Sequence, residues 1–292
     1  MLRMTPARTC LALIPIIATS LCGCGGGGGS APAGSGTGSN ATLTAVLHPF
    51  GDTSAMGQRW MDIADYLYSS AFQGAFQYAD NTVTVTYTPS HSIPQFTVDA
   101  PAHALKPNFC YQMKLVGPAE ILPAADPHTF SPTTYALGSH GRWWCETGSW
   151  NVADADMASH VGHTLRGYLY IEFFVTTADG SAHFTSGTTN SYHVTWKSSQ
   201  RVHNTNDGPA RQLTITPAVG WAYDVAQAPT QIGLYGEWEP TRTLPGQMSL
   251  PVGSYSGVEF RLTEESFHSS SLSGGTWWTA MATDPLSFEV TQ

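Results

Sequence analysis

The stretch GYLYIEFFVT, residues 167–176, decides the fold, because it is the strongest β-strand pattern in the chain. Successive side chains of a strand point to opposite faces, and apolar residues fill both faces here: Leu169, Ile171, Phe173 and Val175 on one, Tyr168, Tyr170 and Phe174 on the other. A strand that is apolar on both faces is covered on both sides. We therefore expect 167–176 to lie at the centre of a sheet.

Shorter strand patterns recur before and after this stretch, separated by turn residues such as Asp179-Gly180. They lie at 41–50, 81–88, 95–100, 105–117, 181–185, 191–196, 212–216, 231–238, 255–263 and 286–290. About ten strands with little helix between them predict an all-β protein, an antiparallel β-sandwich. We expect one domain over 41–292, with a division into two sub-domains near residue 200 as the alternative.

Two segments break the strand pattern. Met56, Trp60, Ile63 and Leu67 recur at three- and four-residue steps, which predicts one amphipathic helix over 54–70. Residues 118–166 are rich in Pro, Ala, Asp and His and show no sustained periodicity. They predict a long inserted loop, where functional residues are often found.

The spacing Leu105-x-Pro107-x-x-x-Tyr111 resembles a motif of fibronectin type III and related immunoglobulin-like sandwiches. The resemblance implies an immunoglobulin-like fold in which Tyr111 closes a corner by bonding to backbone a few residues upstream. If Tyr111 points inward, strand alternation places Cys110, Gln112 and Lys114 on the outer face.

The N-terminus carries an export pattern. Arg3 and Arg8 precede the apolar run 10–21, which is too short to span a membrane. Leu21-Cys22-Gly23-Cys24 resembles the lipobox of bacterial lipoproteins, which implies a signal peptide over 1–23, lipidation of Cys24 and attachment to a membrane. Residues 24–40 then form a lipidated Gly/Ser linker. Gly25 after the lipidated position resembles lipoproteins of the outer membrane, facing either the periplasm or the exterior.

The expected export determines which cysteines can form a disulfide. Cys110 and Cys145 are the two cysteines left after removal of the signal and lipidation of Cys24. Two thiols in an oxidising compartment favour one Cys110–Cys145 disulfide, with two buried thiols as the alternative.

Charge and motifs exclude several functions. The formal net charge is −9, so the basic footprint of a nucleic-acid-binding protein is absent. The sequence contains no G-x-S-x-G, H-E-x-x-H, P-loop or C-x-x-C pattern, which argues against the common enzyme classes. We expect Glu264 and Glu265 to be solvated acids at the end of a strand.

Two groups of residues suggest binding. Asp154, Asp156, His160 and His163 cluster within 154–163 and could hold a divalent transition metal, although solvated loop residues are the commoner outcome. Trp143-Trp144 and Trp277-Trp278 are adjacent pairs, so one indole of each pair faces away from the core. That indole is either covered by a loop or helix or forms a platform for a glycan or a protein partner.

Three functions follow from these patterns. The first is a lipid-anchored binding or structural module of the cell envelope without enzymatic activity or cofactor; the second is a periplasmic metal-binding protein; the third is a carbohydrate-binding or carbohydrate-active protein. The segments 105–117, 141–144, 167–176, 191–196 and 262–268 together resemble an uncharacterised family of prokaryotic secreted proteins, which implies no activity.

Overall fold

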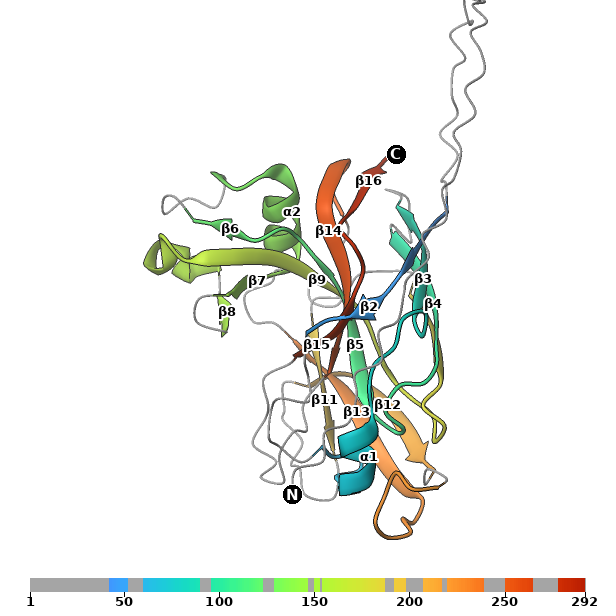
Figure 1. Cartoon of the computed structure of the whole chain (residues 1–292). Coiled ribbons are helices and arrows are strands. Elements are labelled where there is room, and N and C mark those ends of the chain that lie inside the picture. The colour runs from blue at the N-terminus through green and yellow to red at the C-terminus, as the bar shows by residue number, and fades with distance from the viewer. Residues whose placement is uncertain are drawn as a thin grey trace, which may run out of the picture. The chain divides into compact units, whose positions relative to one another are not determined.

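The computed structural model describes residues 42–51, 60–89, 96–122, 129–146, 150–152, 154–186, 192–197, 207–216, 220–238, 250–264 and 278–291 (Figure 1). Its helical segments are α1 (Ser70–Ala75), α2 (Pro132–His140) and the 3-10 segment η3 (Asp154–His160). Its strands are β1 (Leu43–Val46), β2 (His48–Pro49), β3 (Thr84–Pro89), β4 (Phe96–Ala102), β5 (Cys110–Val116), β6 (Glu120–Ile121), β7 (Arg142–Cys145), β8 (Trp150–Val152), β9 (Thr164–Val175), β10 (Ala182–Ser186), β11 (Tyr192–Lys197), β12 (Asp207–Ile215), β13 (Thr230–Trp238), β14 (Gly253–Glu264), β15 (Trp278–Ala282) and β16 (Leu286–Val290).

The strands form three antiparallel sheets. The largest runs in the order β2-β15-β14-β5-β9-β7-β8, with β16 paired to β14 and β6 paired to β9. A second sheet has the order β1-β3-β4-β10, and a third has the order β11-β13-β12. The predicted all-β, antiparallel, sandwich-like fold is confirmed, whereas its immunoglobulin-like character stays a prediction.

Strand β9 lies at the centre of the largest sheet, as its two apolar faces predicted. It pairs with β5 along one edge and with β7 along the other. On β5, Met113 lies opposite Glu172 and Lys114 opposite Tyr170, so Ile171 is an extra residue that forms a bulge. Because β9 has twelve residues, it joins the core at its C-terminal end to the segment 118–166 at its N-terminal end.

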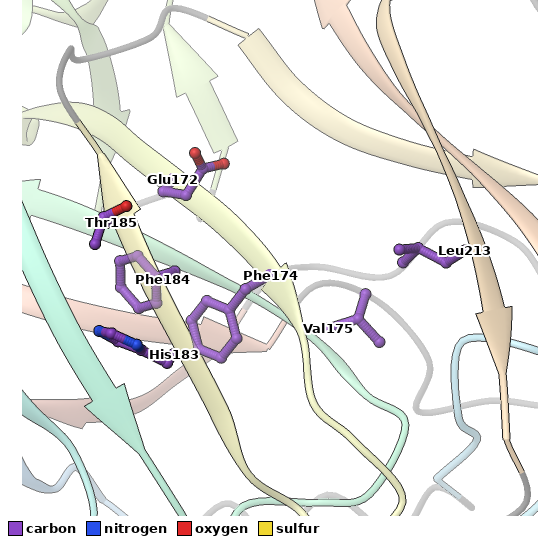
Figure 2. A pocket seen from close by; sticks show the side chains of 7 residues that line it. All are labelled: Glu172, Phe174, Val175, His183, Phe184, Thr185 and Leu213. Carbon is purple, nitrogen blue, oxygen red and sulfur yellow. The ribbon is translucent and has the colours of Figure 1, made fainter.

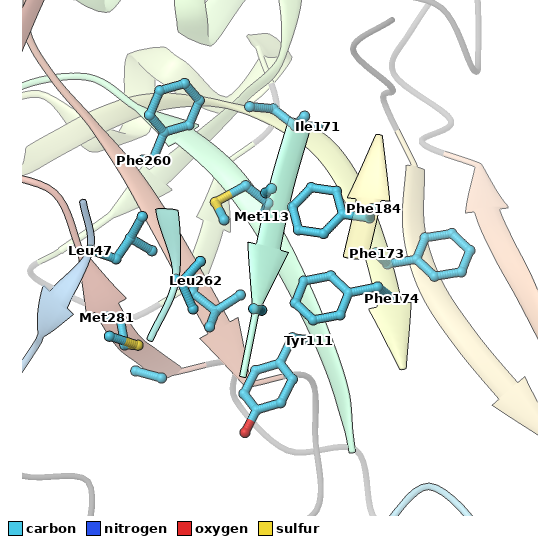
Figure 3. Packing of buried hydrophobic residues seen from close by; sticks show 14 of the residues in the cluster. Leu47, Tyr111, Met113, Ile171, Phe173, Phe174, Phe184, Phe260, Leu262 and Met281 are labelled. Carbon is cyan, nitrogen blue, oxygen red and sulfur yellow. The ribbon is translucent and has the colours of Figure 1, made fainter. Parts of the chain in front are cut away.

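The main core lies where the largest sheet meets the sheet that contains β10. Met113, Ile171 and Leu262 come from three neighbouring strands and are fully buried (Figure 3). Phe174 of β9 stacks on Phe184 of β10, with ring centroids 4.6 Å apart. This stack joins the two sheets, because the large aromatic rings fill the space between the packed faces.

Strand β5 is covered on both faces, contrary to the alternation expected from Tyr111. All seven of its residues are buried, and Cys110, Gln112 and Lys114 are at most 1% exposed. The expectation that these three side chains face solvent is therefore wrong. Cys110 belongs to the main core, and the Lys114 ammonium lies 5.2 Å from the centroid of the Tyr170 ring, so side chains on both faces of β5 are covered.

The helix predicted over 54–70 is not formed in its described part. Residues 52–59 lie outside the described residues, and 60–69 form turns and isolated bridges before α1 begins at Ser70. The Asp62 carboxylate accepts hydrogen bonds from the backbone N–H groups of Ala64 (2.8 Å) and Tyr66 (2.9 Å), so it competes with helical pairing. Asp65 has φ = 66°, which no helix accommodates. The apolar periodicity of this segment reflects burial in turns.

We expect Asp62 to make the stability of the protein depend on pH. Burial raises the pKa of Asp62 to about 6, although hydrogen bonds from Tyr223, Tyr66 and Ala64 oppose the rise. A carboxyl group whose pKa is raised on folding binds its proton more tightly in the folded state, so its contribution to stability grows as the pH falls from 7 through 6 towards 4. In urea unfolding, wild type should gain about 2–3 kcal/mol relative to Asp62→Asn between pH 7.5 and pH 4.5. Parallel curves for the two proteins would contradict this.

The segment 118–166 is not the irregular loop predicted, because it contains β6, α2, β7, β8 and η3. Ser131 caps α2 by accepting a hydrogen bond from the Thr134 N–H, and Pro132 begins the helix. The residues that α2 buries include Thr133, Thr134 and Gly138, so its buried face is mostly small and polar. That composition leaves no apolar periodicity in the sequence.

Among the described residues, no helix is both long and apolar enough to cross a membrane.

Candidate metal centre

Three potential metal ligands converge at the N-terminal end of β9. Cys145 is the last residue of β7 and lies opposite Leu165 of β9 and Trp150 of β8. His160 ends η3, and His163 directly precedes β9. Strand pairing and one helical segment thus bring together residues that are 15 and 18 positions apart in the sequence.

The turn that carries the two histidines is held by backbone hydrogen bonds. The N–H of His163 donates to the carbonyl oxygen of His160 (2.9 Å), and the N–H of Leu122 donates to the carbonyl oxygen of His163 (3.0 Å). Gly162 donates to Leu122 in return (2.7 Å) and has φ = 82°, a conformation that favours glycine. The histidine pair is therefore fixed by the turn and by β6, which ends next to Leu122.

The donor atoms of the three residues face one another. His160 Nδ1 lies 3.3 Å from His163 Nδ1, which lies 3.6 Å from Cys145 Sγ. All three donor atoms are within 4.8 Å of one another. Cys145 is fully buried and the two imidazoles are partly exposed. Both contacts are hydrogen bonds, whose protons a bound metal would displace.

The two contacts of His163 Nδ1 match the distances between ligand atoms in a tetrahedral zinc site. With Zn–N of about 2.0–2.1 Å and Zn–S of about 2.3 Å, two nitrogens on one zinc ion lie about 3.3–3.4 Å apart, and a nitrogen and a sulfur about 3.5–3.6 Å apart. Both measured contacts fall in these ranges. Two of the three distances between donor atoms are therefore those of a tetrahedral zinc site, and the third pair lies within 4.8 Å.

Of the two aspartates predicted beside the histidines, Asp156 does not belong to the cluster of donor atoms among the described residues. Asp156 is exposed, and only its backbone carbonyl makes a described contact, with the Ser159 hydroxyl (2.7 Å). Asp154 lies in η3, but its side chain is outside the described residues. Sequence reasoning missed Cys145 as a ligand because it assigned that thiol to a disulfide.

The predicted Cys110–Cys145 disulfide is wrong. Cys110 lies opposite Val175 at one end of β9, and Cys145 lies opposite Leu165 near the other end. Ten residues of strand separate those positions, which is on the order of 30 Å. A disulfide requires Cα atoms within about 7 Å of each other. Both cysteines are buried thiols, in different apolar clusters.

The exposed tryptophan among the described residues lies at a position that the sequence analysis did not select. Trp143 is 1% exposed and stacks on Phe130 at 5.1 Å, whereas Trp144 is half-buried and packs on the opposite face of the sheet beside Tyr168 and Tyr170. Trp277 and the side chain of Trp278 lie outside the described residues. Trp221 is 56% exposed and packs its ring 5.2 Å from that of Phe72. Its neighbourhood carries no strand pattern that would have drawn attention to it.

The corner motif surrounds a buried ion pair. The Tyr111 hydroxyl accepts a hydrogen bond from the Lys106 backbone N–H (3.0 Å), which is the kind of contact that the resemblance implies, and Leu105 and Pro107 flank this lysine. The Lys106 Nζ atom lies 2.7 Å from Glu264 Oε1, and both side chains have no exposed area. Glu264 is therefore not the solvated acid expected at a strand end.

Aromatic residues complete the surroundings of this pair. The Lys106 ammonium lies 3.5 Å from the centroid of the Trp60 ring. The Tyr78 hydroxyl donates to Glu264 Oε1 (2.5 Å) and lies 2.9 Å from the Tyr111 hydroxyl. Burial lowers the pKa of Lys106 to about 8, and the Glu264 carboxylate opposes that change. The pair ties the corner before β5 to the end of β14.

A pocket of about 350 Å³ lies at the other end of β9 (Figure 2). It is lined by Glu172, Phe174, Val175, His183, Phe184, Thr185 and Leu213, which come from β9, β10 and β12. The three sheets meet there. The His183 Nε2 atom lies 2.7 Å from Asp99 Oδ1, so the polar groups at this pocket already include an exposed ion pair.

Comparison with known proteins gives no match: no family model, no curated protein and no solved structure is similar to this chain.

Proposed function

We propose that this protein is a metal-binding protein of the bacterial cell envelope, and that Cys145, His160 and His163 bind a zinc ion. The observation that carries the proposal is the convergence of one sulfur and two imidazole nitrogens within 4.8 Å, with two of the three distances between them equal to those of a tetrahedral site. Of the three functions that the sequence suggests, metal binding is the one for which the described residues provide a built site.

The donor set favours a transition metal over magnesium or calcium. Thiolate and imidazole are ligands of zinc and copper, whereas magnesium and calcium prefer oxygen. A thiolate with two neutral imidazoles carries one negative charge, which partly neutralises a divalent ion. Burial of Cys145 beside Trp143 and Leu165 keeps the sulfur away from bulk water. We select zinc because its preferred tetrahedron fits the contacts.

The location in the envelope is supported by residues 1–40. The lipobox-like residues 21–24 and the Gly/Ser linker predict a chain tethered through Cys24. A linker of this length would hold the folded part roughly 20–24 Å from the lipid surface. A metal site on such a tether would meet ions entering or leaving the cell.

The test is zinc stoichiometry and affinity in protein purified without a histidine tag. We expect about one zinc ion per chain, measured by elemental analysis and by competition with a chelator. Cys145→Ser, His160→Gln and His163→Gln should each weaken zinc binding by at least about 100-fold, because loss of a ligand exceeds the effect of losing a supporting residue.

His183→Gln is the matched control. His183 is an exposed histidine on β10 that contacts Asp99 at the other end of β9. Zinc affinity should stay at the wild-type value in this variant. Absence of zinc from wild-type protein at micromolar metal, or equal losses in His183→Gln and His163→Gln, would refute the proposal.

A further inference from the structure

The proposed zinc site has three protein donors, Cys145, His160 and His163. His163 Nδ1 lies 3.3 Å from His160 Nδ1 and 3.6 Å from Cys145 Sγ, and one donor atom from each of the three residues lies within 4.8 Å of the other two. A tetrahedral ion needs four ligands. Structural zinc sites have four protein ligands, and sites with three keep the fourth position for water or another molecule.

The nearby acids that the structure describes do not supply a fourth donor. Glu146 follows Cys145 directly, but its carboxylate pairs with the Arg166 guanidinium. Asp156 is exposed and outside the cluster of donor atoms. The group of potential ligands among the described residues therefore consists of Cys145, His160 and His163.

The imidazole side of the site lies at the protein surface. Cys145 is fully buried, whereas His160 and His163 are partly exposed. Between them, Val161 is 45% exposed and Gly162 is exposed. A small molecule can thus approach the histidines without unfolding the sheet.

From these observations, and resting on the proposed function, we infer that the bound metal keeps one coordination position open for an exogenous ligand. One thiolate leaves a net positive charge on a divalent ion, so the position favours an anion, a thiolate or an imidazole over a cation. Such a ligand would come from a small molecule or from a side chain of a second protein that receives the metal. The site is then suited to exchange, in contrast to a closed site that only stabilises the fold.

Cobalt(II) loaded into the full-length protein tests the inference, because its visible spectrum reports coordination number and ligands. We expect ligand-field bands of a tetrahedral ion and a thiolate-to-cobalt charge-transfer band that is absent in Cys145→Ser. Sodium azide and imidazole, each added alone, should shift the ligand-field bands saturably, while dialysis shows that cobalt stays bound.

The outcomes separate the inference from the proposed function. If cobalt and zinc do not bind, the proposed function fails. If cobalt binds through Cys145 but saturating azide and imidazole leave the bands unchanged, or strip the metal, the open position is refuted. Asp154→Asn and Asp156→Asn complete the design: a changed cobalt spectrum in either variant would identify a fourth protein ligand and overturn the inference, whereas unchanged spectra support it.

Discussion

Lys106→Met is expected to destabilise the protein by about 3–5 kcal/mol, because the variant leaves Glu264 charged and fully buried without its cation. The Trp60 ring and the Tyr78 hydroxyl cannot replace the ammonium, since the ring presents a negative face and the hydroxyl already donates to Glu264. Urea unfolding at pH 7 measures the loss, because Glu264 is ionised in the unfolded chain at that pH and its burial without Lys106 then costs stability.

The double variant Lys106→Met with Glu264→Leu should recover most of that stability. Replacing both partners of a buried pair by apolar residues is often neutral, because neither charge then has to be desolvated. The matched control is His48→Ala, which removes a pair with Asp80 at a similar distance (3.0 Å) but on the surface. It should cost less than about 1 kcal/mol. If Lys106→Met lost no more stability than His48→Ala, or if the double variant recovered none of the loss, the buried pair would not have the stabilising role that we assign to it.

Gly167→Ala is the second substitution with a large expected effect. A Cβ atom at residue 167 would lie 2.3 Å from Gly138 N and 2.3 Å from Thr134 O, both in the backbone of α2. Backbone cannot move aside as a flexible side chain can, so α2 must shift away from β9. We expect a loss of about 3 kcal/mol, at the upper end of the usual cost of overpacking.

The same variant should also weaken zinc binding, because Gly167 lies opposite Trp143, two residues before Cys145. Gly74→Ala is the matched control: Gly74 lies in α1, and a Cβ there meets nothing within 4 Å. It should stabilise the protein by about 0.5–1 kcal/mol. Equal unfolding midpoints and zinc affinities for the two variants would contradict the close approach of α2 to β9.

Local sequence patterns were sufficient to predict the fold where one segment carried the whole signal. The two apolar faces of 167–176 predicted a central strand, and β9 is one. The local patterns predicted the wrong secondary structure where a polar side chain bonded to the backbone. The Asp62 carboxylate accepts hydrogen bonds from two backbone N–H groups that helical pairing would have used. The described part of 54–70 therefore does not form the helix that its apolar spacing predicts.

The site required information that only strand pairing provides. His160 and His163 could be selected from the sequence because they are close along the chain. Cys145 could not, because its position beside them depends on the register of β7 against β9. Lys106 and Glu264 were equally hidden, since each residue alone resembles a solvated charge and 158 positions separate them.

The distance between Cys110 and Cys145 has a practical consequence for producing the protein. Because no cross-link joins these two cysteines, folding of the described residues requires no oxidant and no disulfide isomerase. A version that lacks residues 1–23 and is expressed in a reducing cytosol should reach the same structure, with the Cys145 side chain as a thiol.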